Sequence, residues 1–171
     1  MAKTTAITAV SQALVKLLQD AAPQSTPPPQ FALYQPGNFE TPMEAGISVF
    51  LYDCQVEPGA RNLPLPRDPS GQRPRPPLAL TLRYVITPWA QDATQQQRWL
   101  GWLRRTLYDH PVLTVAFLNQ AAGTDVFAAP ESVRVEDDDQ ALALMDRLRL
   151  LHKLNPRTPP SVMVRVIGLQ L

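Results

Sequence analysis

Residues 78–111 constrain the fold more than any other stretch of the chain, because the apolar pattern changes there from the period of a strand to that of a helix. In the first part, large apolar side chains stand at every second position: Leu78, Leu80, Leu82, Tyr84 and Ile86. This period of two predicts a strand with one face on a core. Pro88 has no N–H to donate, so we expect the strand ladder to end there.

A helix is predicted to follow this strand, with the carboxylate of Asp92 accepting from its first free amides. Its apolar stripe consists of Trp99, Leu100, Leu103 and Leu107. The pair His110-Pro111 is expected to end the helix, because a residue before proline is pushed out of the α region.

The rest of the chain supplies elements that can pack against this strand and helix. Residues 5–20 have the 3–4 spacing of a helix with one buried stripe. Residues 46–56 and 161–171 carry apolar side chains on both faces, which is typical of strands inside a sheet. Residues 131–135 predict a further short strand, residues 31–34 are compatible with another, and residues 112–118 form an apolar segment.

A third helix is predicted within residues 140–154, and its apolar residues cover more than one side. Leu144, Met145, Leu148 and Leu151 make the stripe expected to face the core, whereas Leu142, Leu150 and Leu154 lie off it. Such a helix needs a second partner besides its own sheet. The acidic run at residues 136–139 is expected to cap this helix and to interact with its dipole; a carboxylate metal site is the alternative.

Nineteen prolines gather mainly in two irregular segments, residues 21–42 and 57–77. The second segment is longer than ordinary connections and carries Arg61, Arg67, Arg73 and Arg75. Two interpretations stay open: a disordered surface loop, or a proline-stiffened arm that orders on a neighbouring subunit. Residues 1–171 otherwise fit a single domain.

Composition argues against several functional classes. Sixteen basic and fifteen acidic side chains give a net charge of +1, so no global field attracts nucleic acid or an anionic membrane. Cys54 is the single cysteine, which excludes an internal disulfide, and its apolar surroundings favour a buried structural thiol over a nucleophile. No secretion signal or membrane-length apolar run is present, which predicts a soluble protein made in the cytoplasm.

Motifs that would carry chemistry are also missing from the sequence. There are two histidines, and no glycine-rich phosphate loop, HExxH, G-x-S-x-G or CxxC sequence occurs. We therefore expect no enzyme activity, cofactor, metal or small-molecule substrate. An enzyme with a site dispersed over distant segments is the less favoured alternative.

Five segments in order suggest a family: AITAVSQALVKLLQDA, VFLYDCQVEPGARN, PPLALTLRYVITPWA, LGWLRRTLYDHPVL and PPSVMVRVIGLQL. Together they resemble the N-terminal domain of the cap or tail-terminator proteins of extracellular contractile injection systems, which are phage-tail-like particles. The resemblance implies the fold of phage tail terminators. With the predicted elements, the expected class is α+β: a mixed, largely antiparallel sheet with about three helices packed against it.

The resemblance also implies a structural role. Members of this family are thought to form a hexameric ring on the distal end of the inner tube, to contact the last sheath layer, and so to stop polymerisation. The implied partners are further copies of the chain, the tube and the sheath, with no nucleic acid and no membrane. Assembly is then expected in the cytoplasm, within a phage-tail-like particle that can be released from the cell.

A ring subunit needs contact residues beyond its own core. Candidates for subunit, tube or sheath contacts are Arg61, Asn62, Arg73, Arg75, Trp102, Arg105, Leu150 and Leu154. For Trp102 a partly buried core position is an equal alternative, and for Arg61 and Asn62 a local turn. The competing function is a nucleic-acid-binding adaptor using the loop arginines, although the loop has no aromatic side chain to stack on bases.

Overall fold

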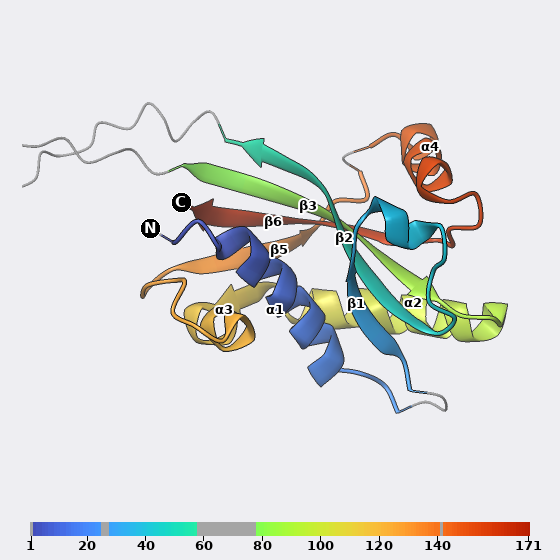
Figure 1. Cartoon of the computed structure of the whole chain (residues 1–171), viewed down its shortest axis with the longest axis horizontal. Helices are drawn as coiled ribbons and strands as arrows, with labels where there is room; N and C mark the ends of the chain where they lie inside the picture. The colour runs from blue at the N-terminus through green and yellow to red at the C-terminus, as the bar shows by residue number, and fades with distance from the viewer. Residues whose placement is uncertain (1, 25–27, 58–77, 141) are drawn as a thin grey trace, which may run out of the picture.

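The computed structural model describes residues 2–24, 28–57, 78–140 and 142–171. Its helices are α1 (Ala6–Asp20), α2 (Ala93–Asp109), α3 (Val115–Ala122) and α4 (Leu144–Leu154), with a 3-10 helix η1 (Pro36–Phe39). Its strands are β1 (Gln30–Tyr34), β2 (Gly46–Val56), β3 (Ala79–Trp89), β4 (Val112–Thr114), β5 (Ser132–Asp137) and β6 (Val162–Gln170). All six strands form one sheet in the order β1-β2-β3-β6-β5-β4 (Figure 1).

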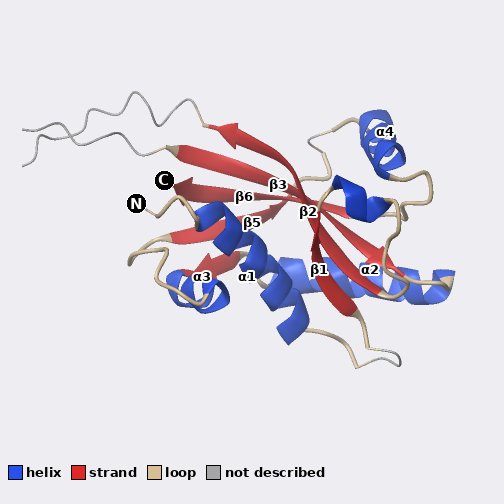
Figure 2. Cartoon of the chain, viewed as in Figure 1, coloured by secondary structure: helices blue, strands red, loops and turns tan. Residues whose placement is uncertain are grey.

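The predicted fold class is confirmed. β1 runs parallel to β2 and every other pair is antiparallel, so the sheet is mixed and largely antiparallel. Figure 2 shows the helices arranged around this sheet. The structure has one α-helix more than predicted, and this helix is α3. It arises because the apolar segment at residues 112–118 divides into the edge strand β4 and the start of α3, which Thr114 caps.

The first face of the sheet is covered by α1, α2 and α3. The alternating side chains of β3 point into this core together with Leu14 and Leu18 of α1 and with Trp99 and Leu103 of α2. Tyr84 lies at the centre, fully buried, with its hydroxyl 2.9 Å from Ser11 Oγ. The stripes predicted for the first two helices are therefore the ones that pack.

The second face of β3 is also buried, which the alternation did not predict. Val85 packs with Leu151 of α4 and Met163 of β6, and Trp89 packs with Phe39 of η1. β3 thus lies at the centre of the sheet, between β2 and β6, with cover on both faces.

The ladder was expected to end at Pro88, and it extends one residue pair further, to Trp89 and Gly46. β3 continues to Trp89, and Pro88 stands opposite Ile47 of β2. Pairing with β6 has already stopped at Ile86 and Val162. Since Pro88 has a strand on one side only, its missing N–H leaves no ladder bond unmade.

Two boundary predictions hold at α2. The Asp92 carboxylate accepts from the backbone N–H of Gln95 at 2.9 Å, and the helix ends at Asp109, before His110 and Pro111. Local sequence signals are sufficient here because a cap and a stop act within one turn.

The prediction of a buried Cys54 is wrong, because its side chain is exposed. β1 pairs with β2 only from Gly46 to Phe50, so the second half of β2 has no described strand on its outer edge. The residual burial still raises the pKa of the Cys54 thiol, and the neighbouring Asp53 carboxylate raises it further.

Candidate functional site

The acidic run at residues 136–139 contacts arginines from four elements, and we call this group the acid–arginine cluster. Its carboxylates belong to Glu136, Asp137, Asp138 and Asp139, and its main guanidinium groups to Arg83 of β3, Arg104 of α2, Arg147 of α4 and Arg165 of β6. Each carboxylate thus faces at least one cation. The cluster joins the middle of the sheet to a helix on each of its faces.

Asp138 and Arg83 form the innermost pair of the cluster. Asp138 is only 4% exposed, and its Oδ2 accepts from Nη1 of Arg83 at 2.6 Å. Asp53 of β2 stands 3.7 Å from Nε of the same arginine. Charges this deep are tolerated when they are paired, and this contact ties β3 to the residue that follows β5, across the intervening strand β6.

The outer pairs reach the helices. Arg104 of α2 donates to Asp137 at 3.3 Å and also contacts Asp139. Asp139 in turn pairs with Arg147 of α4 at 3.1 Å. Asp139 therefore bridges the two helices through one carboxylate.

This arrangement overturns the capping prediction. α4 begins at Leu144, its N-cap position is Ala143, and no side chain caps it. Arginines of β3, α2, α4 and β6 bind the acidic side chains instead. Among the described residues, no group of three His, Cys, Asp or Glu side chains is placed to hold a metal ion.

A groove of about 800 Å³ runs between α2 and the β5–β6 side of the sheet. Val135, Val162 and Val164 line it, and its charges are of both signs. They belong to Arg104, Arg105, Glu136 and Asp137. Tyr108, also in its lining, is 78% exposed, with the Arg105 guanidinium 5.8 Å from its ring centroid. The groove offers apolar area and arginine, which suits a protein contact better than bond-making chemistry.

The outward face of α4 differs from the prediction. Leu144, Met145 and Leu148 were expected to face the core, yet they are 61%, 60% and 49% exposed. Leu151 alone of that stripe is buried. Because α4 is apolar on several sides, the period identifies a helix but does not select which side meets the sheet.

Two predicted contact residues of α4 face their own chain. Leu150 packs with the Val85 cluster, and Leu154 packs with the cluster of Phe39 and Trp89. Both are half-buried. The exposed apolar residues of α4 are instead Leu144, Met145 and Leu148, which the sequence analysis did not predict as contact residues. The high leucine content of this helix was the signal that some of its apolar side chains would remain exposed.

The two predicted residues of α2 behave differently from each other. Trp102 is half-buried against Phe31, with ring centroids 6.4 Å apart, and its indole N–H donates to the Ala21 carbonyl at 3.0 Å. Arg105 is 73% exposed and pairs with Asp109 at 2.8 Å. Trp102 thus has contacts within the chain, whereas Arg105 stands on the surface beside the groove.

The remaining four predicted residues, Arg61, Asn62, Arg73 and Arg75, lie outside the described residues. The nucleic-acid alternative rests on the same segment. Elsewhere, burial raises the pKa values of Tyr34, Tyr52 and Tyr84, and these are packing positions in the core or at its margin. No helix in the described part of the chain is long and apolar enough to cross a membrane.

Two solved structures resemble this chain throughout. The PVC sheath/tube terminator of an extracellular contractile injection system, in its extended state, matches all of this chain and 58% of its own, with 18% identity and a TM-score of 0.67. The tube-terminating cap of the anti-feeding prophage matches 95% of this chain and 54% of its own, with 17% identity and a TM-score of 0.65. The chain thus spans a little over half the length of these structures, and the likeness shows a shared fold.

The sequence comparisons agree with the fold. A search of curated protein sequences gives no match. The sequence profile described as the Pvc16 N-terminal domain matches residues 9–166, which is nearly the whole chain. The matched region begins within α1 and ends within β6, so it includes β1 to β5 and the first part of β6. This protein belongs to the Pvc16 N-terminal domain family.

Proposed function

We propose that this protein is the structural cap of a contractile injection system. Copies of it, six in number, form a ring on the distal end of the inner tube, contact the last sheath layer and terminate polymerisation. The observation that carries the proposal is the family match over residues 9–166, supported by the shared fold with two terminator structures. Assembly takes place in the cytoplasm, and the cap becomes part of a phage-tail-like particle.

The surface chemistry supports a role in contacts. The ionic groups around residues 136–139 pair with one another, and exposed apolar residues stand on α2 and α4. Charged groups that are already paired hold elements in place, while exposed apolar groups gain by being covered. We propose the arm residues Arg61, Asn62, Arg73 and Arg75 and the groove residue Arg105 as contacts to tube, sheath or neighbour.

Deleting the gene in a strain that makes the particles tests this proposal. We expect tubes and sheaths of irregular length by electron microscopy, and restoration of uniform length by the wild-type gene supplied in trans. A gene copy encoding Arg105→Glu should restore uniform length less well than one encoding Arg98→Glu, a charge reversal at another exposed arginine of α2. Particles of normal, uniform length in the deletion strain refute the cap function.

A further inference from the structure

Leu144, Met145 and Leu148 form an uncovered apolar surface that we call the α4 ridge. Each of the three is about half exposed or more, and Leu151 is the only fully buried residue of this 11-residue helix. A helix of this length is marginal in water unless its apolar surface packs. The chain covers one side of α4 and leaves the three ridge side chains largely exposed, with Leu144 and Leu148 lining a hollow of about 430 Å³ that Leu100 and Arg104 of α2 also line.

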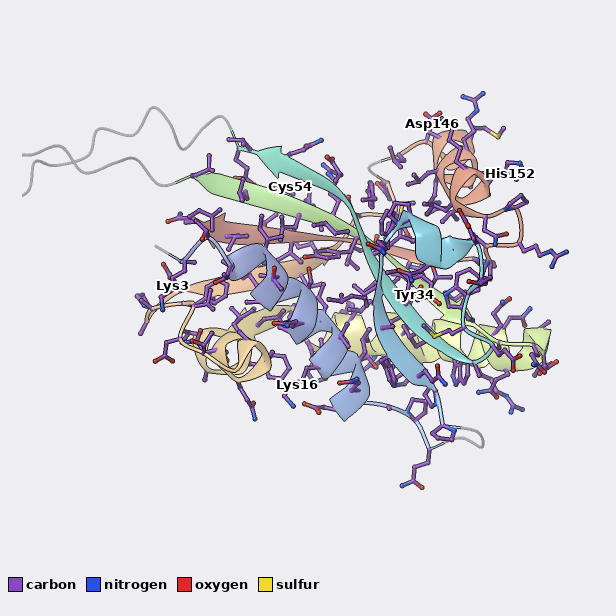
Figure 3. All side chains as sticks on the ribbon, in the orientation of Figure 1. Lys3, Lys16, Tyr34, Cys54, Asp146 and His152 are labelled. Carbon is purple, nitrogen blue, oxygen red and sulfur yellow. The ribbon has the colours of Figure 1, made fainter. Side chains whose placement is uncertain are left out.

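The flanks of the ridge are basic. Arg149, His152 and Lys153 are exposed, and Figure 3 shows His152 on α4 pointing away from the sheet. Arg149 pairs with the single acid of the helix, Asp146, at 3.3 Å. Lys153 has no ion pair among the described residues. A surface that covers the ridge must therefore be apolar and carry negative potential at its edge.

The chain has such a surface on the other face of the sheet, and we call it the β4 hollow. It has a volume of about 440 Å³, and its lining includes Leu17, Ala21, Val112, Leu113 and Phe117. Val112 of the edge strand β4 is 46% exposed there. The hollow is thus mostly apolar and open at a free edge of the sheet.

Two helices end at this hollow. α1 ends at Asp20, which lines it, and α2 ends at Asp109, next to the lining residue His110. Neither helix has a basic residue in its last turn, and helix C-termini carry negative partial charge. Because Lys16 pairs with Asp20 at 3.1 Å, the negative potential comes mainly from the helix ends.

We propose that the α4 ridge of one copy docks in the β4 hollow of the next copy. A ridge-to-ridge contact would set Arg149 and Lys153 against the same cations of the second copy, whereas the hollow offers potential of opposite sign. The ridge and the hollow lie on opposite faces of the sheet, so the contact joins unlike surfaces. Repeated head to tail, such a contact gives a ring when the rotation between neighbouring copies closes, as the proposed cap requires. This inference rests on the proposed ring and adds the surfaces that build it.

A mixing experiment with the full chain tests the docking. Leu144→Asp with Leu148→Asp removes the ridge, and Val112→Asp spoils the hollow. Each variant alone should assemble about tenfold or more weakly than the wild type by sedimentation velocity and native mass spectrometry. Their mixture keeps one good ridge and one good hollow, so it should give a heterodimer of two 19.0 kDa chains and no ring.

Leu33→Asp is the matched control, because Leu33 is 43% exposed on β1 and belongs to neither surface. It should assemble like the wild type, and circular dichroism should show all variants folded. Rings of wild-type size from either test variant overturn the docking and leave the cap function standing. A mixture without heterodimer, a control as defective as the test variants, or a wild type that stays monomeric also overturns it.

Cross-linking provides a gain of signal that does not depend on weakened assembly. In a Cys54→Ser background, Leu148→Cys and Val112→Cys in one chain should give a ladder of disulfide-linked multiples under mild oxidation, since the chain then has no other thiol. Either single cysteine should stop at a dimer or remain monomeric. Absence of the ladder from a wild-type-like oligomer contradicts the contact, whatever the result of the gene deletion.

Discussion

Replacing Asp138 by Asn should destabilise the protein far more than replacing its neighbour Asp137. Asp138 is 4% exposed and lies 2.6 Å from a guanidinium that is itself only 20% exposed. Asn keeps the shape and removes the charge, so Arg83 loses a charge-assisted bond and retains only Asp53 at 3.7 Å. We expect a loss of about 2–3 kcal/mol in the free energy of unfolding, below the upper range for a buried pair because Asp53 and some solvent remain.

Asp137 is the matched control within the same run. It is 62% exposed and pairs with Arg104 at 3.3 Å, and exposed pairs contribute about 0–1 kcal/mol. Urea unfolding followed by tryptophan fluorescence measures both variants. For a chain of this size the Asp138 variant should also melt about 4–12 °C lower.

A double-mutant cycle separates the interaction energy of Arg83 with Asp138 from the other effects of changing either residue. Arg83→Met alone leaves Asp138 buried without its cation, whereas Arg83→Met with Asp138→Leu removes both charges. The double variant should lose about 1–2 kcal/mol less free energy of unfolding than the sum of the losses from Arg83→Met alone and Asp138→Leu alone. Equal unfolding midpoints for the Asp137 and Asp138 variants refute the reasoning. Strict additivity in the cycle does the same.

Three further predictions concern backbone space, a buried hydroxyl and the thiol. Gly46→Ala should lower the free energy of unfolding in urea by about 1–3 kcal/mol, because the new Cβ would meet the Gln30 carbonyl oxygen, a backbone atom. Gly101→Ala, with open space in mid-helix, should instead raise it by about 1 kcal/mol. A Gly46 variant more stable than the Gly101 variant contradicts this. Tyr84→Phe should cost only about 0.5–1.5 kcal/mol, since Ser11 keeps its bond to the Ile7 carbonyl; a loss above about 3 kcal/mol argues against it. Cys54 should react with a thiol reagent in the folded protein, slowly at neutral pH and faster as pH rises towards its raised pKa; labelling only after unfolding disproves its exposure.

Features set within a few residues were predictable from the sequence. The first two helices, their buried stripes, the Asp92 cap and the inner positions of β2 and β6 in the sheet follow from spacing and local chemistry. The parts that failed depend on what packs from elsewhere. The period of two predicts one core-facing side for β3, yet Thr81 and Thr87 on its other side are also buried.

The acidic run illustrates the same limit. A run of carboxylates before a helix satisfies the local rule for capping, and the sequence does not show which arginines the fold brings to the run. The sheet order brings Arg83 and Arg165 beside the run, and the helices add Arg104 and Arg147. The buried bond between Arg83 and Asp138 at 2.6 Å outweighs a dipole interaction of about 0.3–1 kcal/mol, so the run binds arginine and α4 starts without a side-chain cap.

The same bonds explain how an uncovered helix keeps a definite position. Arg147 near the start of α4 is tied to Asp139, Leu151 packs on Val85 and Met163, and Asn155 just past its end donates to the Phe39 carbonyl at 2.6 Å. These contacts hold α4 in place, while Leu144, Met145 and Leu148 stay at least 49% exposed. An exposed surface that its own chain already holds in position loses little further conformational freedom on binding. This lowers the entropy cost of docking. The acid–arginine cluster is therefore best understood as the support of a contact surface. Removing the carboxylate of Asp139 should weaken the association of copies even though Asp139 belongs to neither proposed surface.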